Sequence, residues 1–289
     1  MEKNSFLRHI VELNIALLLI STSGVLGRYI QLAPPVTIWT RCVLGAIILG
    51  LYCWRMGITL KFNVRKNGLS FLLGSIFLGI HWITYFYALQ LSTVAIAMLS
   101  LFTFPVITAL LEPLFFKMKL DPWQIFLGII VLIGIYFLMP DFDFSNDYTK
   151  GVLVGVVSAF FYALRNIVLK KQLVVYQPTM LMFYQLLFIS LLLWPVLFMF
   201  DTTNISVQWQ AVLTLAIVTT AMGHTFFVVS LKNFSASTVG IFSSIQPIYG
   251  IILAYFLLDE MPSANILIGG FLILTTVGLE SFKTYRKDY

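Results

Sequence analysis

The chain has 289 residues, of which 60% are hydrophobic and only 10% charged, and its mean hydropathy is +0.94. This composition is far more apolar than that of an average soluble domain, and the apolar runs lack the alternation of membrane barrel strands. The formal charge of +6 does not indicate a nucleic-acid partner, because the cations gather between apolar spans. The sequence therefore predicts an all-α integral membrane protein.

Ten apolar stretches follow one another along the chain, each of roughly the length that a helix needs to cross a bilayer. They are residues 10–27, 34–54, 69–91, 93–116, 122–139, 151–170, 178–200, 208–231, 235–258 and 263–282. We expect the first stretch to stay in the protein, because no small-residue cleavage site follows it. Cys42 and Cys53 fall about 16 Å apart on one helix, so they predict neither a disulfide nor a metal site.

The cations indicate how the spans are oriented, because Lys and Arg collect on the cytoplasmic side of a membrane protein. With a cytoplasmic amino terminus, the inside segments hold Lys3, Arg8, Arg55, Lys61, Arg65, Lys66, Lys117, Lys119, Lys170, Lys171, Lys232, Lys283, Arg286 and Lys287. The outside segments hold only Arg28 and Lys150, while Arg41 and Arg165 lie within spans. This bias predicts that both termini are cytoplasmic.

The two halves of the chain repeat the same order of features. Displacing the first half by 142 residues, the separation of Pro105 from Pro247, also places Lys117-Met118 over Asp259-Glu260. Each half then has two apolar spans joined by a short polar hinge, a mid-span proline, a charged turn and a glycine-bearing span. Five spans are an odd number, so the second copy must be inverted in the membrane relative to the first.

These paired motifs, Leu89-Gln-Leu-Ser-Thr93 with Pro105 and Gly128, and Ser235 with Pro247 and Gly270, resemble the drug/metabolite transporter superfamily, in particular EamA-type ten-helix exporters. The resemblance implies two inverted five-helix repeats, residues 1–140 and 151–289, joined by a periplasmic linker at 141–150. It also implies a central cavity lined by helices 1, 3, 4, 6, 8 and 9. The turn at Lys117-Met118-Lys119 departs from the family by lacking an acidic residue.

Polar side chains inside spans usually face the interior of a helix bundle, and they supply the candidate substrate-binding residues. These are Arg165, Arg41, His81, Trp82, Tyr85, Tyr162, Asn166, His224, Gln246 and Tyr249. A buried guanidinium suits a substrate carboxylate, and we expect this role more strongly of Arg165 than of Arg41, which lies nearer a span end. For each arginine the alternative is a structural role.

Two prolines, Pro105 and Pro247, lie mid-span at matched positions, and we expect them to break their helices and to serve as hinges. Gly151 and Gly155 form a small-residue face for close helix packing. The carboxylates lie near span ends, so His81 and His224 are the only deep groups that titrate near neutral pH, and proton coupling would use them.

The prediction is thus a bacterial inner-membrane transporter that exports small metabolites such as amino acids by alternating access around a midplane cavity. A carrier of nucleotide sugars or other metabolites remains an alternative, as does a lipid scramblase or membrane scaffold. No enzyme motif such as HExxH or GxSxG occurs, and no cofactor is expected. The expected partners are a small-molecule substrate and the lipid bilayer, with the chain a monomer or a homodimer.

Overall fold

The protein is all-helical in the described part of the chain. The computed structural model describes residues 2–116, 119, 121–139, 143–230 and 242–288. Its helices are α1 Glu2–Tyr29, α2 Pro34–Arg55, α3 Val64–Leu91, α4 Val94–Leu101, α5 Phe104–Phe116, α6 Pro122–Leu138, α7 Asp147–Leu173, α8 Pro178–Leu193, α9 Val196–Met199, α10 Ile205–Thr214, the π-helical segment η1 Leu215–His224, α11 Thr225–Ser230, α13 Gln246–Leu258 and α14 Ala264–Asp288. The prediction of an all-α membrane fold is confirmed.

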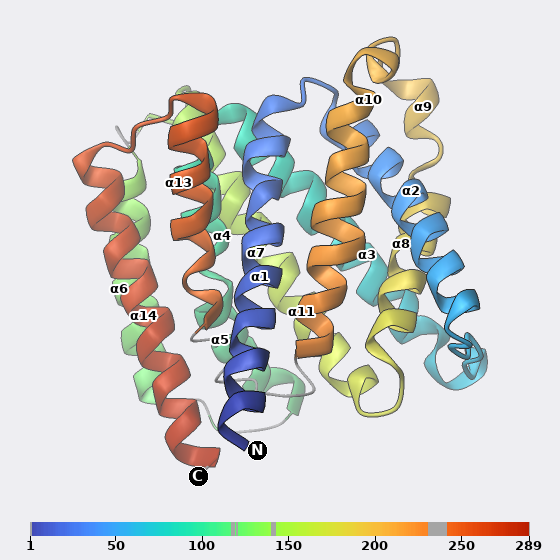
Figure 1. The fold of residues 1–289 in the computed structure, drawn as a ribbon. Helices are drawn as coiled ribbons and strands as arrows, with labels where there is room; N and C mark the ends of the chain where they lie inside the picture. Colours follow the sequence, from blue (N-terminus) through green and yellow to red (C-terminus); the bar gives the residue numbers. More distant parts are fainter. Residues whose placement is uncertain (1, 117–118, 120, 140–142, 231–241, 289) are drawn as a thin grey trace.

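In the described part of the chain, every predicted span coincides with a helix or with a short series of helices; residues 235–241 of the predicted span 235–258 lie outside it. Among the described residues, seven helical segments are long and apolar enough to cross a membrane, and three shorter apolar helices accompany them, namely Pro122–Leu138, Gln246–Leu258 and Ala264–Glu280. Both termini lie at the same end of the molecule, as an even number of crossings requires (Figure 1). Ten crossings are consistent with this arrangement.

Side-chain caps and prolines set the helix ends that the sequence indicated. Pro34, Pro122 and Pro178 each occupy the first residue of a helix, where their missing N–H would have no partner in any case. Helix α7 begins at Asp147, four residues before the predicted span, because the Asn146 side chain accepts a hydrogen bond from the Tyr148 N–H at 2.8 Å. The predicted linker is therefore partly helical.

The helices that contain the matched prolines are interrupted just before them. Helix α4 ends at Leu101 and α5 starts at Phe104, with Pro105 as its second residue, so the carbonyl of Leu101 has no N–H partner four residues on. Pro247 is likewise the second residue of α13, which follows a turn at Ser244 and Ile245. Residues 231–241, including Ser235, lie outside the described part of the chain.

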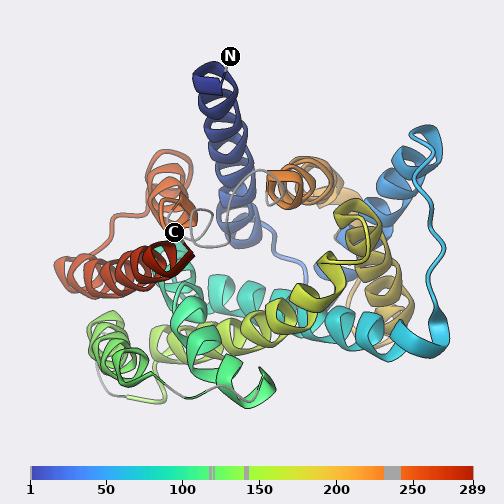
Figure 2. The same cartoon turned by 90° about the horizontal axis from the view of Figure 1, so that it is seen from below.

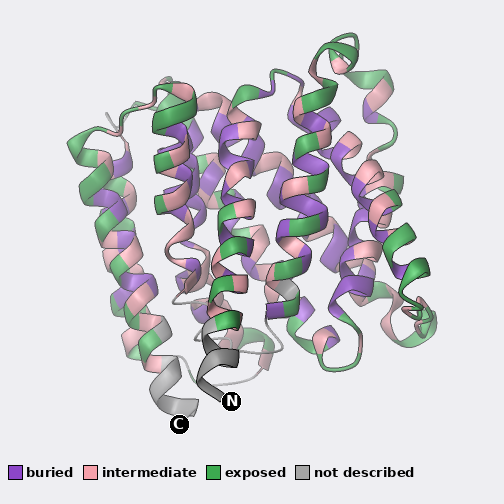
Figure 3. Cartoon of the chain, in the orientation of Figure 1, coloured by how far each residue is buried: buried purple, intermediate pink, exposed green. Residues whose placement is uncertain are grey.

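The helix contacts relate the two halves by an approximate twofold exchange. Helix α3 packs along α7, and η1 packs in the corresponding way along α1. Helices α2 and α8, α4 and α13, and α6 and α14 pair across the two halves (Figures 1 and 2). Buried residues gather on the sides where the helices face one another, while exposed residues cover the outer sides (Figure 3). The buried core of the molecule therefore lies between the two halves.

Candidate functional site

A cavity of about 50 Å³ lies between the two halves. Its lining comprises Ile20, Ser23, Arg41, His81, Trp82, Tyr85, Leu101, Phe102, Phe104, Tyr162, His224, Phe227, Ser243 and Gln246. These residues come from α1, α2, α3, α4, α5, α7, η1, α11 and α13, so the lining includes the helices implied by the resemblance and adds α2. Since one water needs roughly 10–15 Å³, the cavity in this conformation holds a few waters and is closed to a metabolite.

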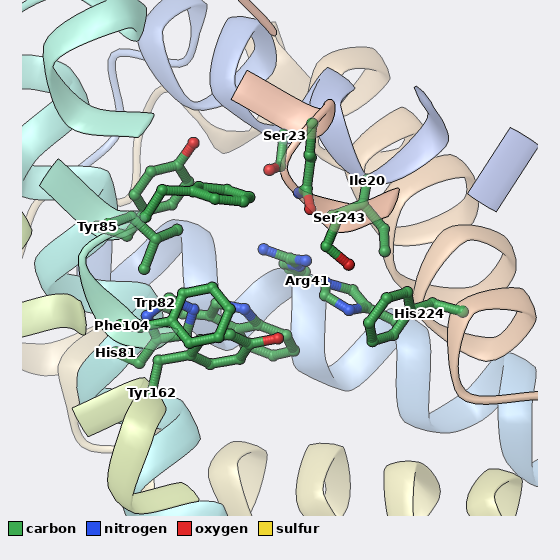
Figure 4. A pocket seen from close by; sticks show the side chains of 14 residues that line it. Ile20, Ser23, Arg41, His81, Trp82, Tyr85, Phe104, Tyr162, His224 and Ser243 are labelled. Atoms are coloured by element: carbon green, nitrogen blue, oxygen red, sulfur yellow. The ribbon is translucent and has the colours of Figure 1, made fainter. Parts of the chain in front are cut away.

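Arg41 projects into this cavity from α2 (Figure 4). It lies about 10 Å along the helix from its first residue, and its side chain is only 1% exposed. Its Nε donates a hydrogen bond of 2.6 Å to Thr220 Oγ1, and its Cζ lies 4.0 Å from the centroid of the Trp82 ring. The guanidinium is thus held over the Trp82 ring, with only its Nε bonded to Thr220.

The two terminal nitrogens of Arg41, Nη1 and Nη2, are buried without a hydrogen-bond partner among the described residues. A buried cation of this kind normally has a carboxylate partner. Here none of the described residues that line the cavity is an aspartate or glutamate. The positive charge of Arg41 therefore has no anionic partner in the described cavity lining, and its Nη1 and Nη2 are available to a ligand there.

His81 is anchored on the opposite wall by Ser158 of α7. Ser158 Oγ donates to the His81 carbonyl at 2.9 Å, and the His81 Nδ1 lies 2.7 Å from Ser158 Oγ and 3.2 Å from the Ser158 carbonyl. Because the hydroxyl proton is already used and the carbonyl can only accept, these bonds assign a proton to Nδ1 and leave Nε2 as the acceptor of the neutral ring. The ring also lies 4.5 Å from Tyr162, whose other neighbour is Phe104 at 4.7 Å.

His224 closes the cavity from the end of η1. Its ring centroid lies 5.7 Å from that of Trp82, so the Trp82 ring contacts both the imidazole and the Arg41 guanidinium. The wider π-helical turn places Thr220 Oγ1 3.1 Å from the Leu215 carbonyl, five residues back, and presents the same oxygen to Arg41. Segments of π-helix often occur at functional sites. The paired histidines predicted from the two halves are therefore both at the cavity.

Three of the predicted binding residues lie elsewhere. Arg165 donates from Nη2 to Gln185 Oε1 at 2.8 Å and from Nη1 to Asn166 Oδ1 at 3.1 Å, and neither Arg165 nor Asn166 lines the cavity. Tyr249 donates to Asn14 Oδ1 at 3.2 Å near the amino-terminal part of α1. These side chains have hydrogen-bond partners within the protein, as the structural alternative to substrate binding requires.

The cavity also contains residues that the sequence did not single out. They are Ile20, Ser23, Leu101, Phe102, Phe104, Phe227 and Ser243. Ser23 carried a recognisable signal, because Ser21-Thr22-Ser23-Gly24 interrupts the hydrophobic run of its span. The apolar members carried none, since 26 phenylalanines in this chain occur in every environment.

The arrangement offers hydrogen bonds, one fixed positive charge and aromatic faces, which suit recognition of a small solute. Among the described residues, no group of three or more His, Cys, Asp or Glu side chains could hold a metal ion. Helices from both halves surround this site, so relative movement of the halves would open it. Such a fold and site define a multi-pass membrane transporter.

Comparison with known proteins identifies the family. The model of the EamA-like transporter family matches residues 10–139 and again residues 149–281. The chain therefore belongs to the EamA-like transporter family, and each half carries one copy of its domain. Similarity to one solved crystal structure extends over 98% of this chain and 99% of that chain, with a TM-score of 0.68 at 18% identity, which shows the shared fold.

The curated relatives are named as transporters. An uncharacterized transporter of Archaeoglobus fulgidus is 28% identical over 67% of this chain and 69% of its own length. The uncharacterized transporter YxxF of Bacillus subtilis is 23% identical over 84% of this chain and 80% of its own. The pseudopaline exporter CntI of Pseudomonas aeruginosa is 22% identical, covering 82% of each chain.

Proposed function

We propose that this protein exports small metabolites such as amino acids across the bacterial inner membrane by alternating access. The observation that carries the proposal is the cavity built from both halves, in whose lining Arg41 and two histidines lie inside an apolar helix bundle. Polar groups at this depth are costly and usually serve a pathway for solutes. The export direction is supported by the pseudopaline exporter among the relatives.

The two halves would rock about the cavity so that it opens to one side of the membrane and then to the other. The interruptions before Pro105 and Pro247 would serve as hinges, because backbone hydrogen bonds are already missing there. Arg41, His81, Trp82, Tyr85, Tyr162, His224 and Gln246 would contact the substrate. Protonation of His81 or His224 would couple export to a proton gradient.

The proposed orientation places both termini in the cytoplasm, on the strength of the cation distribution. A carboxyl-terminal fusion to green fluorescent protein should fluoresce, and a matching alkaline phosphatase fusion should be inactive. A fusion after Asp143, in the loop before α7, should give the reverse result. Phosphatase activity at the carboxyl terminus would contradict the orientation.

Transport itself is tested by efflux from sealed liposomes that contain the purified protein. The vesicles are loaded with radiolabelled amino acids, their 2-hydroxy acid counterparts, nucleosides or sugars, with and without a pH gradient. Efflux of a small solute above that from protein-free vesicles supports the carrier, and a response to the gradient supports proton coupling. Absence of flux for every solute would contradict it.

Two other functions would give different results in the same vesicles. A nucleotide-sugar carrier would move diphosphate conjugates, although such anions need several cations and the cavity provides one guanidinium. A lipid scramblase would move labelled phospholipid between leaflets without solute efflux. The small cavity, with one guanidinium and polar groups from both halves in its lining, favours a carrier of small solutes over both.

A further inference from the structure

Arg41 and Arg165 are both buried arginines within spans, but their surroundings differ. Both terminal nitrogens of Arg165 have amide oxygen partners, from Asn166 and Gln185. Both terminal nitrogens of Arg41 have none among the described residues, although Arg41 is the more deeply buried of the two. Thr220 fixes only its Nε and thereby leaves the planar fork of Nη1 and Nη2 unused.

An unpaired buried cation is destabilising unless another group compensates it. Stacking on Trp82 at 4.0 Å contributes a cation–π interaction, but it satisfies no N–H group. The planar fork matches a carboxylate, which accepts two parallel hydrogen bonds. The arrangement of Arg41 is therefore that of a binding site whose anion comes from outside the chain.

The rest of the cavity gives a substrate ammonium group no anionic partner. The described lining residues include no carboxylate; the lining holds one arginine, Arg41, and two histidines, His81 and His224. The other walls are largely aromatic, with Tyr85, Phe102, Phe104, Tyr162 and Phe227 among them. A zwitterion would have to bury its positive charge beside a guanidinium, which is unfavourable at this low dielectric.

We infer that the preferred cargo is a small organic monoanion, whose carboxylate binds Nη1 and Nη2 of Arg41 and whose apolar body lies against the aromatic walls, rather than a zwitterionic amino acid. This inference rests on the proposed carrier function and, at the same site, replaces the amino acids named there by small monoanions as the preferred substrate class. The cavity admits such a molecule only after the halves separate, since its volume is about 50 Å³ in this conformation.

The test compares ligands that differ only in the charged substituent. Equilibrium binding of radiolabelled L-phenyllactate, L-lactate and glycolate to the purified full chain in detergent is measured beside L-phenylalanine, L-alanine and glycine. At least one hydroxy acid should bind about tenfold or more tightly than its amino acid, a ratio that corresponds to about 1.4 kcal/mol. Equal or tighter binding of the amino acids, or binding of none of the three hydroxy acids, would overturn the inference.

Variants at Arg41 separate recognition from folding. Arg41→Lys keeps a charge but loses the fork, so hydroxy-acid affinity should fall about tenfold or more. Arg41→Gln should abolish measurable binding, and Arg41→Met should melt at the same or a higher temperature than the parent, because an uncompensated buried charge is removed. Arg55→Gln, at the exposed end of the same helix, is the matched control and should bind as the parent does.

Retention of the anion preference in Arg41→Gln would contradict the assignment, and so would strong destabilisation of Arg41→Met, which would show a structural role. The liposome assay tests the carrier function separately from the anion preference. Efflux of amino acids without binding of any hydroxy acid would overturn the anion preference and leave the carrier standing. Absence of efflux for every solute would overturn the carrier.

Discussion

At the scale of single residues, Thr220 determines where the Arg41 guanidinium lies. Its hydroxyl donates to the Leu215 carbonyl at 3.1 Å within η1, so the hydroxyl proton is already used and an oxygen lone pair is left for Arg41 Nε. Thr220 Oγ1 is therefore a hydrogen-bond acceptor with a fixed direction, 2.6 Å from Arg41 Nε. Thr220 is thus a positioning residue that acts on the substrate through Arg41.

Thr220→Val should leave Arg41 Nε buried and unsatisfied, at a cost of about 1–3 kcal/mol in unfolding free energy. It should also weaken anion binding by about tenfold, because a displaced fork no longer meets both carboxylate oxygens. Thermal unfolding and equilibrium binding of L-phenyllactate measure the two effects. Thr214→Val, an exposed position whose hydroxyl bonds only the Gln210 carbonyl, should change neither. Unchanged binding in Thr220→Val would show that Trp82 alone positions the guanidinium.

Arg165 calls for a different expectation. Arg165→Ala removes both donors to Asn166 and Gln185 and leaves their buried oxygens unpaired, at a cost of about 1–3 kcal/mol for each unsatisfied group. Protein abundance and transport should therefore fall together. Fluorescence of a carboxyl-terminal fusion and efflux per molecule are the measurements. A loss of efflux at normal protein abundance would instead show that Arg165 acts in substrate binding.

The sequence predicted which polar residues lie at the site better than it predicted the hydrogen-bond partner of each one. Depth within a span placed Arg41, His81 and His224 among the candidates, and all three line the cavity. Depth favoured Arg165 over Arg41, but it could not show that Arg165 has a partner in Gln185, which belongs to another helix. Contacts between residues distant in sequence leave no trace in the periodicity of either helix.

At the scale of helices, small residues set how closely α4 and α7 approach. A methyl group added at Gly155 would lie 2.6 Å from the Ser100 Cβ, and one added at Gly151 would lie 2.6 Å from the Ser92 Cβ. A Cβ atom cannot move by a change of rotamer, so relief would need a shift of the whole helix. This contact joins the first half of the chain to the second beside the cavity.

Gly155→Ala should therefore lower the melting temperature, with a loss of about 1–3 kcal/mol from overpacking. Gly278→Ala is the matched control, since an added methyl at that helical position meets nothing within 4 Å. It should stabilise the protein by about 0.5–1 kcal/mol through the reduced backbone entropy of the unfolded chain. Thermal unfolding in detergent compares the two variants. Equal effects would show that the close approach of α4 and α7 is not tightly packed.

Helix positions were predictable because hydrophobic length and proline placement act locally. The spans and the interruptions before Pro105 and Pro247 follow from such local rules. The π-helical turn of η1 was not predicted, since the residues of Leu215–His224 fit an ordinary apolar helix equally well. Its wider turn coincides with the bond from Arg41 to Thr220, which is a tertiary contact.

At the scale of the whole molecule, one cluster ties the two halves together at the end opposite the termini, where α13 and α14 are joined (Figure 1). Glu260 of the second half accepts a hydrogen bond from the Val94 N–H at the start of α4 at 2.8 Å and pairs with Arg28 Nε at 3.2 Å. Arg28 also donates to the carbonyls of Leu89 and Gln90. Separation of the halves at this end must break these bonds.

In the sequence, the duplicated turn has no glutamate at the matching position, which lies outside the described part of the chain. Displacement by 142 residues places Met118 at the position of Glu260, and a methionine offers no carboxylate to a helix amino terminus. At the other end of the molecule the halves are instead joined by ion pairs of Lys170 with Glu112 at 3.0 Å and of Lys283 with Asp121 at 2.6 Å, so different contacts hold the two ends of the carrier. In the orientation proposed above, the Glu260 cluster favours a conformation closed to the outside.

Glu260→Gln should shift the equilibrium toward the outward-open conformation. Hydrogen bonds that involve a charged group contribute about 1.5–3 kcal/mol, so weakening them should change the population ratio by about tenfold or more. Spin labels at Tyr29→Cys and Met261→Cys, both exposed and one in each half, report this as a longer distance in pulsed electron paramagnetic resonance. The native cysteines, Cys42 and Cys53, are buried.

Asp147→Asn is the matched control for Glu260→Gln, because Asp147 lies at the same end but pairs only with Lys150 on its own helix, at 2.8 Å. It should leave the distance distribution between the labels unchanged. A Glu260→Gln protein with the parental distribution would show that packing of α4 against α13, rather than the charge cluster, keeps this end closed. Since both helices also contribute to the cavity lining, closure of this end and closure of the cavity would then be a single packing event.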